Sequence, residues 1–345
     1  MSEILIQHLI IHELEKEPEH IEARLFLAEA TTPLDSRADL LVEKLNHTFL
    51  QKEDILHGYL SPPGDALFPG YFQHLVDEQL TKEAFIDFSR DTMNALQLNL
   101  QGVVGAKGGY LVYAIYEVEN TRMLGVFLVR DTEGLAFRKE GEDAAAFLLD
   151  TVTYLNTDKL AMACRIHLNR FEEGEGRFVE LIKHARSQKE ISEYFVSWIG
   201  LERPESSKTL TQSFLQMVEE LPMPVDESTG EQMEEGRFRE KVLNFAMQSP
   251  QKTINLEHFG QELYGDPEAT KPFLQDKEVG LDNEFRFDRN TMKQFYNYKA
   301  NAEGIYIYFN RNHLNHQQVR IEGDTVIIQS PELAEQILDI LGDKS

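Results

Sequence analysis

The sequence predicts an α+β protein of two domains, and three observations support this prediction. Segments of strand-like and helix-like periodicity are grouped in runs instead of alternating regularly, which favours α+β over a doubly wound sheet. The chain has 345 residues, 41% of them hydrophobic, which is enough for two cores. A polar stretch with a proline, Leu201–Lys208, separates two helical patterns. We therefore expect a domain of residues 1–200 with a mixed antiparallel sheet and helices, and a helical domain of residues 209–345 that ends in a small antiparallel sheet.

The first hundred residues predict two strands and then helices. Ile4–Ile11 is a candidate strand, and Ile21–Ala28 alternates apolar and polar residues with the period of two that a strand requires. DSRADLLVEKLNHTFLQK has the pattern of a helix, with Asp35 or Ser36 as its N-cap. After a loop with prolines and a glycine, two further segments are predicted to be helical, PGYFQHLVDEQL and TKEAFIDFSRD.

The glycine-rich stretch GVVGAKGGYLVY, Gly102–Tyr113, raises the question of a phosphate-binding loop. Such a loop needs its glycines after a strand and before a helix, because the helix N-terminus supplies free N–H groups to the anion. Here a helical pattern precedes the glycines and an apolar strand pattern follows them, and Lys107 is followed by Gly108 instead of a hydroxyl residue. We therefore predict a flexible turn that leads into a buried, central strand.

The rest of the first domain predicts strands and one helix. Tyr110–Val118 and Met123–Arg130 are joined by a short polar turn, as in an antiparallel hairpin, and LAFRK is a candidate third strand. Leu160–Leu168 and Arg177–Ala185 are expected to be strands as well. KEISEYFVSWIG has the pattern of a helix that ends at a C-cap glycine, Gly200.

The second domain begins with helical patterns and closes with strands. We expect helices at SKTLTQSFLQMVEEL, EQMEEGRFREKVLNFAMQS and NLEHFGQELYG, and a short helix around NTMKQFYNYK. Three strands should follow, GIYIYFN, QVRIEG and TVIIQS, the last two joined as a hairpin at Gly323 and Asp324. The chain should end in the helix PELAEQILDILG.

The composition indicates a folded cytoplasmic protein that does not bind membranes. No apolar run is long enough to span a bilayer, and the opening residues MSEILIQHLIIHELEKE lack a basic leader and a cleavage site. Cys164 is the only cysteine and lies in an apolar context, so we expect neither an internal disulfide nor a thiolate metal site. The reducing cytoplasm suits such a chain.

We find no catalytic or metal-binding signature in the sequence. His8 and His12 lie four apart in a strand pattern, which separates them by about 13 Å, too far for one zinc ion. His313 and His316 lie in a loop pattern without a cysteine or an acidic neighbour. The acidic turn EEGEG is most simply a solvated loop. We therefore expect no enzyme, no metal and no cofactor, while residues that converge from distant positions escape this search.

The net charge is strongly negative, with one local exception. The chain has 59 acidic against 34 basic residues, a formal net charge of −25, and such a surface repels a polyanion at long range. In Lys159–Lys189 the balance reverses, with seven cations against four carboxylates: Lys159, Arg165, Arg170, Arg177, Lys183, Arg186 and Lys189 against Glu172, Glu173, Glu175 and Glu180. The tightest part, KHARSQK, immediately precedes the expected helix start, where N–H groups and cations together could hold a phosphate. The alternative, that these cations pair with the surplus of acids, stays open.

Several of these segments together resemble the bacterial nucleoid-associated protein family of the NdpA/YejK type. They are RIHLNRFEEGEGRFVELIKHARSQKEISEYFVSWIG, INLEHFGQEL, FRFDRNTMKQFYNY and the closing GIYIYFN and VRIEGDTVII, and GGYLVYAIYE after a helical segment also fits. The resemblance covers nearly the whole chain in element order. It is most specific over Arg165–Gly200 and Asn255–Ile328, and loose over the first hundred residues.

The resemblance implies a cytoplasmic, non-enzymatic protein of the nucleoid that organises chromosomal DNA. An acidic protein could stay on DNA through a local cationic face, for which the candidate DNA-binding residues are Lys183, Arg186, Lys189, Arg177 and Arg170. In the alternative, the protein is an acidic adaptor that docks onto a chromosome-acting enzyme or another DNA-binding protein, with Tyr194, Trp198 or the C-terminal sheet as contact surface. Aromatic residues at helical spacing are more often core. A homo-oligomer is a further option.

Overall fold

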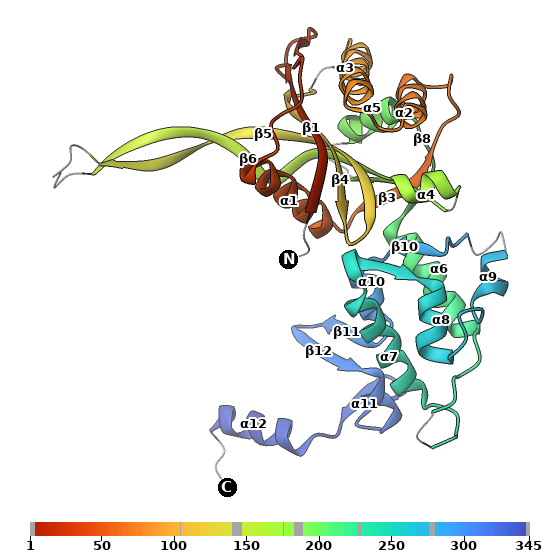
Figure 1. Cartoon of the computed structure of the whole chain (residues 1–345). Coiled ribbons are helices and arrows are strands. Elements are labelled where there is room, and N and C mark those ends of the chain that lie inside the picture. The colour runs from red at the N-terminus through yellow and green to blue at the C-terminus, as the bar shows by residue number, and fades with distance from the viewer. Residues whose placement is uncertain are drawn as a thin grey trace. The chain divides into compact units, whose positions relative to one another are not determined.

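The computed structural model describes residues 4–103, 105–139, 147–174, 176–182, 189–226, 229–275 and 280–342 (Figure 1). The chain divides into two compact units, Met1–Ser207 and Lys208–Ser345. The first unit combines an antiparallel sheet with helices, and the second combines helices with small hairpins. The predicted α+β class is therefore confirmed.

Unit 1 is built on one sheet of eight strands in the order β2-β1-β4-β5-β6-β7-β3-β8, and its strand pairs are antiparallel. The predicted hairpin is confirmed as β4 and β5, and β4 lies between two strands, as expected after the glycine turn. The strands are β1 (Ile4–Glu15), β2 (Arg24–Phe26), β3 (Ile55–Leu60), β4 (Gly109–Val118), β5 (Thr121–Lys139), β6 (Phe147–His167), β7 (Val179–Ile182) and β8 (Leu201–Ser206).

Helices cover both faces of this sheet, because β4 is apolar on both sides. Leu111, Tyr113 and Ile115 share one core with helices α2 (Leu67–Asp77), α3 (Lys82–Asn99) and α5 (Lys189–Ile199). Val112 and Ala114 share a second core with α1 (Ser36–Gln51). Alternate side chains of a strand point to opposite faces, so a strand that is apolar throughout must be covered twice.

Strands β5 and β6 continue past the rest of the sheet as a two-stranded ribbon, which Figure 1 shows in yellow and green. Its pairing runs from Asp131↔Leu155 outward to Lys139↔Phe147. The segment LAFRK belongs to β5, so the prediction of a separate third strand there is wrong. The irregular register around Val129 lets one strand turn out of the sheet without ending.

Two segments of unit 1 differ from expectation. Ile55–Leu60 is the strand β3, although only a loop and helices were expected there. Leu201–Ser206, expected to be a linker, is the strand β8, and it pairs with β3 through Tyr59↔Glu202 and Leu60↔Leu201. Both strands are short and polar in part, so their pairing partners, which are distant in sequence, determine their structure.

Unit 2 packs helices α6 (Ser207–Glu220), α7 (Glu235–Gln248), α8 (Leu256–Tyr264) and α10 (Arg289–Gln294) around a hydrophobic cluster of its own. The helix α9 (Lys271–Gln275) is short. Two hairpins join β11 (Asn297–Ala302) to β12 (Ile305–Asn310) and β13 (Val319–Glu322) to β14 (Thr325–Ile328). A third antiparallel pair consists of β9 (Thr253–Asn255) and β10 (Glu284–Arg286), with α8 and α9 between them in the chain. The residues NYK, expected in a short helix, begin β11 instead. Helices α11 (Arg311–Asn315) and α12 (Pro331–Leu341) complete the unit.

None of the helices in the described ranges is both long and apolar enough to cross a membrane.

Candidate nucleic-acid interface

The structure brings two of the five candidate DNA-binding residues together. Arg170 lies in the short helix α4 (Leu168–Glu173), and Arg177 follows the acidic turn just before β7. Nη1 of Arg170 donates a hydrogen bond to the backbone carbonyl of Arg177 at 3.4 Å. Both side chains are half-buried, so each keeps part of its surface open to solvent.

The other three candidates fall outside what the structure describes. Lys183 and Arg186 lie in the gap between residues 182 and 189. Lys189 is the first residue of α5, and its side chain is likewise outside the described part of the chain. In the sequence, Arg177 comes two residues before the short strand β7, and KHARSQK begins directly after its last residue, Ile182.

Arg177 lies over an aromatic side chain. Its guanidinium carbon is 5.9 Å from the centre of the Tyr59 ring, within reach of a cation–π interaction. From Tyr59 a series of edge-to-face contacts runs through Phe178 (5.9 Å), Phe171 (5.1 Å) and Phe72 (4.9 Å). Each ring in this series restricts the orientation of the next. The Tyr59 ring beneath Arg177 is therefore held in place by rings that extend into the core of the unit.

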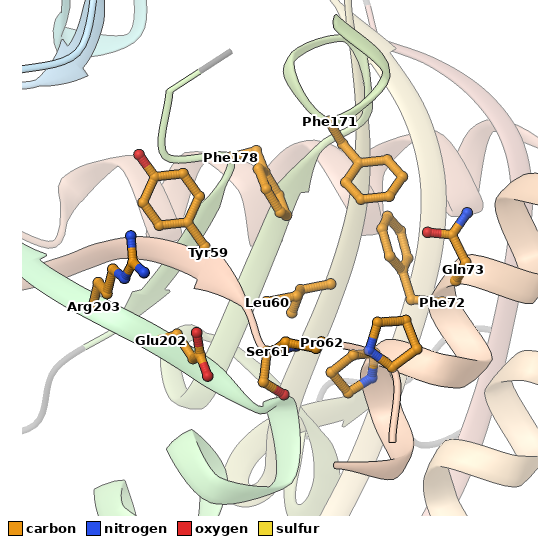
Figure 2. A pocket seen from close by; sticks show the side chains of 12 residues that line it. Tyr59, Leu60, Ser61, Pro62, Phe72, Gln73, Phe171, Phe178, Glu202 and Arg203 are labelled. Atoms are coloured by element: carbon orange, nitrogen blue, oxygen red, sulfur yellow. The ribbon is translucent and has the colours of Figure 1, made fainter. Parts of the chain in front are cut away.

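These rings form a pocket of about 290 Å³, which we call the aromatic pocket (Figure 2). Its other lining residues include two prolines in the turn after β3 and the charged pair Glu202 and Arg203 on β8. The Ser61 hydroxyl in the lining is buried and has no hydrogen-bond partner among the described residues. Sequence reasoning missed Arg203, because β8 was expected to be a linker.

Arg165, one of the seven cations of Lys159–Lys189, is buried and does not belong to the protein surface. It is 1% exposed, and its Nε donates to Oε2 of Glu180 at 2.9 Å while Nη1 donates to Oδ1 of Asn46 at 2.7 Å. Its guanidinium also lies 4.4 Å from the ring centre of Phe49 on α1. Arg165 therefore cannot contact a phosphate. Glu180 is 2% exposed and paired, so its carboxylate does not repel one either.

Two histidines extend this buried cluster. Nε2 of His167 is 3.5 Å and Nδ1 of His57 is 3.9 Å from Oε1 of Glu180. Burial alone would raise the pKa of Glu180, but the charge of Arg165, together with the two histidines, holds that pKa well below its ordinary value. Burial, with the nearby charge of Arg170, lowers the pKa of His167. The positive charge of Arg165 compensates the negative charge of Glu180, so the cluster is a structural network in the core of the sheet.

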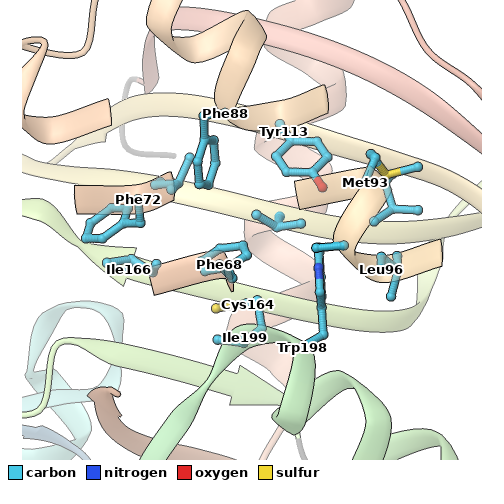
Figure 3. Packing of buried hydrophobic residues seen from close by; sticks show 14 of the residues in the cluster. Phe68, Phe72, Phe88, Met93, Leu96, Tyr113, Cys164, Ile166, Trp198 and Ile199 are labelled. Carbon is cyan, nitrogen blue, oxygen red and sulfur yellow. The ribbon is translucent and has the colours of Figure 1, made fainter. Parts of the chain in front are cut away.

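The aromatic helix α5 is core, as its spacing indicated. Trp198 is buried against Phe68 and Phe195, with ring centres 5.3 and 4.8 Å away, and its Nε1 donates to the carbonyl of Thr92 at 2.8 Å (Figure 3). Cys164 is fully buried in the same cluster, and burial raises the pKa of its thiol. Trp198 is therefore not a contact surface in the folded protein.

Unit 2 carries a second concave surface, a pocket of about 970 Å³ that we call the tyrosine–lysine pocket. Tyr298, Tyr306 and Tyr308 line it from β11 and β12, and within the described ranges its charged lining residues are Lys293 and Lys299. Nζ of Lys299 lies 5.7 Å from the Tyr308 ring centre. Neither lysine makes an ion pair with a described residue. Sequence reasoning missed this pocket, because its residues come from separate elements and NYK was assigned to a helix.

No group of three metal-binding side chains occurs among the described residues. His8 and His12 are held separately, with their Nε2 atoms 2.9 Å from the Leu80 carbonyl and the Ser89 hydroxyl, respectively. His313 lies in the short helix α11 and not in a loop, and its Nδ1 is 2.7 Å from Oδ1 of the N-cap residue Asn310. These histidines have structural partners.

The comparisons with known proteins identify the family. The family model described as nucleoid-associated protein YejK matches residues 10–335, so this chain belongs to that family of nucleoid-associated proteins. A nucleoid-associated protein of Pseudomonas entomophila is 25% identical over 97% of this chain and 98% of its own length. One from Pseudomonas aeruginosa is 24% identical, over 97% of each chain, and one from Pseudomonas putida strain GB-1 is 25% identical over 88% and 89%. The resemblance seen in the sequence is confirmed.

Proposed function

We propose that this protein acts at the nucleoid by binding DNA directly, without sequence preference and without catalysis. The contact surface is the basic segment: Arg170, Arg177, Lys183, Arg186 and Lys189. The observation that carries the proposal is the placement of Arg177, which lies over Tyr59 at one end of β7 while KHARSQK follows the other end. A guanidinium held against a ring is positioned in advance for a phosphate, which lowers the entropic cost of binding.

The electrostatics make the expected binding local and sensitive to salt. The formal net charge of −25 repels DNA over distances up to the Debye length, so cations must contact phosphates at short range to overcome it. Glu172 and Glu173 border the same turn, and Glu172 is paired with Arg122. Such a surface should bind weakly and lose affinity steeply as salt rises.

The tyrosine–lysine pocket is a second candidate contact in the same function. Tyrosine rings offer stacking platforms to unpaired bases, and lysines without carboxylate partners attract phosphates. All three tyrosines and both lysines border one open pocket in a protein that is otherwise acidic. This arrangement favours single-stranded over duplex DNA, because paired bases do not present their faces.

Equilibrium binding to labelled duplex and single-stranded DNA across a salt series tests both surfaces. One variant changes the five residues of the basic segment to glutamine, and a second carries Lys293→Gln and Lys299→Gln. The control carries Lys44→Gln and Lys82→Gln, which neutralise exposed cations on α1 and α3. We expect the first variant to bind duplex DNA more weakly and with a shallower salt slope, by roughly 0.9 for each phosphate that it no longer neutralises. We expect the second to bind single strands more weakly, while the control behaves as wild type.

The adaptor function is the alternative, and the aromatic pocket is the observation that favours it. A shallow pocket of rings and prolines beside Arg203 and Arg177 suits an extended peptide with an acidic residue. If wild-type protein binds neither form of DNA at low salt, the direct-binding proposal is wrong. A protein partner then brings this chain to the chromosome, and Arg203→Gln, a change at an exposed position of the pocket, should weaken that interaction while leaving the fold intact.

A further inference from the structure

The β11–β12 hairpin contributes one side of the tyrosine–lysine pocket, and its register shows which side chains share a face. Lys299 is directly opposite Tyr308. Asn301 is directly opposite Tyr306. Opposed residues, and residues two apart on one strand, lie on the same face, so these four side chains form one surface. Tyr306 is 61% exposed and Tyr308 56%, which leaves more than half of each side chain accessible to a ligand.

Tyr298 borders the same pocket but is held by structural contacts. It is opposite Phe309 on the other face of the hairpin, and the two ring centres are 5.4 Å apart. Its hydroxyl accepts a hydrogen bond from Nη1 of Arg311 at 3.3 Å. Of the three tyrosines in the pocket, Tyr306 and Tyr308 are therefore the two whose rings are available for stacking.

The spacing of these two rings suits an unpaired strand. Tyr306 and Tyr308 are two residues apart on β12, which separates their Cα atoms by about 6.7 Å. This distance is about twice the 3.4 Å between successive nucleotides in one strand of a duplex. Two adjacent bases can each lie on a ring only when they are unstacked from each other, as a flexible single strand allows. Lys299, whose Nζ is 5.7 Å from the Tyr308 ring centre, places a cation beside such a base for its phosphate.

The helices α7 and α10 add side-chain amides to the pocket lining. Asn244 lies on α7 and Gln294 is the last residue of α10, and both are exposed. Within the described ranges, neither side-chain amide has a hydrogen-bond partner, so both remain available to a ligand. A carboxamide presents a donor and an acceptor side by side, which match N7 and the N6 amino group of adenine.

We propose that the tyrosine–lysine pocket distinguishes the bases of an unpaired DNA strand. Two adjacent bases stack on Tyr306 and Tyr308, and Asn244 and Gln294 hydrogen-bond to their edges with a preference for adenine. Stacking supplies affinity for every base, whereas the amide contacts discriminate among bases. This inference rests on the proposed function, which makes DNA the ligand. It adds a base preference for unpaired strands, which duplex binding through the basic segment does not have.

Equilibrium binding of the full-length protein to short labelled strands at one salt concentration tests the preference. The strands are an all-thymine tract and the same tract with two central adenines or two central cytosines. We expect the adenine strand to bind at least about fivefold more tightly than the other two. The double variant Asn244→Ala, Gln294→Ala should lose this difference and bind the all-thymine strand as wild type does.

The matched control for the amides is Gln248→Ala, which removes an exposed amide at the end of α7 outside the pocket lining and should keep the preference. Equal wild-type affinity for the three strands would overturn the proposal, and so would a preference that survives the loss of both amides. Tighter binding of RNA than of DNA of the same sequence would assign the pocket to RNA and overturn it as well.

Alanine and phenylalanine variants test the stacking. Tyr306→Ala and Tyr308→Ala should each weaken binding of the all-thymine strand by at least about fivefold. Tyr306→Phe keeps a ring and should bind as wild type. The control Tyr154→Ala removes a ring that is 54% exposed on β6 in unit 1, and it should also bind as wild type. Wild-type binding by both alanine variants of the pocket would refute the stacking.

Labelled duplex is measured with the same proteins to separate this inference from the proposed function. If duplex DNA binds as proposed while the single-strand results fail, the pocket inference alone is wrong. If wild-type protein binds neither duplex nor single strands, direct DNA binding is wrong and the inference fails with it.

Discussion

Arg165 and Glu180 are directly opposite each other on β6 and β7, and their side chains form a hydrogen-bonded ion pair in the core of unit 1. His57 on β3 pairs with Glu180 across the other side of β7. One carboxylate therefore links three neighbouring strands beneath α1. Such a pair contributes little net stability compared with well-packed apolar residues, but it is costly to break from one side.

Removing one partner of this pair should destabilise unit 1 strongly. Arg165→Met leaves the buried Glu180 carboxylate without its guanidinium partner and with only His57 and His167 beside it, and we expect a loss of about 3–5 kcal/mol in the free energy of unfolding. The double variant with Glu180→Leu should recover part of that loss. Urea unfolding followed by Trp198 fluorescence measures both values. The control Arg122→Met breaks the partly exposed pair with Glu172 and should cost no more than about 1 kcal/mol. Additive losses in the double variant would contradict the coupling.

The stability of unit 1 should fall as the pH drops from about 6.5 to 4, because of His12. Its Nδ1 accepts from the Ala28 amide at 3.0 Å, so the neutral ring carries its proton on Nε2, 2.9 Å from the Ser89 hydroxyl. Burial and the charge of Arg90 lower the pKa of His12 to about 4. Between these pH values the unfolded chain binds a proton that the folded chain does not, which disfavours folding by up to about 3 kcal/mol.

Replacement of His12 separates its contribution to this pH dependence from that of the other titrating groups. Unfolding free energies of wild type and His12→Gln are compared at pH 7.5 and pH 4.5. The variant should be less stable at pH 7.5, and its stability should fall less on acidification. An unchanged difference between the two proteins at both pH values would rule out His12 as the titrating group.

A methyl group at Gly200 should destabilise the protein more than a methyl group at Gly174, although the two glycines have nearly the same φ. Its φ is +68°, and a Cβ there would lie 2.8 Å from the Ser61 hydroxyl oxygen and 2.9 Å from Pro69. Gly174 has a φ of +70° with open space around its Cβ position. We expect Gly174→Ala to cost about 1 kcal/mol from the backbone alone and Gly200→Ala to cost about 2 to 3 kcal/mol. Thermal unfolding compares the two, and equal losses would show that the close approach at Gly200 relaxes freely.

The two units should fold separately. Trp198 is the only tryptophan and lies in unit 1, so its emission reports on that unit alone. A fragment of residues 1–207 should keep the emission maximum of the intact chain, and a fragment of residues 208–345 should keep its helical circular dichroism. A red-shifted emission in the first fragment would mean that unit 1 depends on unit 2 for its core.

Local sequence patterns predicted those helices whose ends are marked by capping residues. Asp35 caps α1 by accepting from the amides of Arg37 and Ala38, and Gly200 ends α5 with a positive φ, both as the sequence indicated. The strands β3 and β8 gave no such signal, because they are short and are held by partners far along the chain. Their pairing also positions Tyr59 and Arg203, so the aromatic pocket could not be predicted without it.

The sequence by itself determined the α+β class, the family and the local excess of cations, because periodicity, element order and charge are properties of the linear chain. Only the tertiary structure decided which of those cations have access to solvent. Arg165 and Arg177 look alike in the sequence. Arg165 is buried beneath α1 and paired with Glu180, whereas Arg177 lies over Tyr59 at the surface. The physical reason is that burial and pairing depend on strands brought together across large sequence separations, which no local pattern encodes.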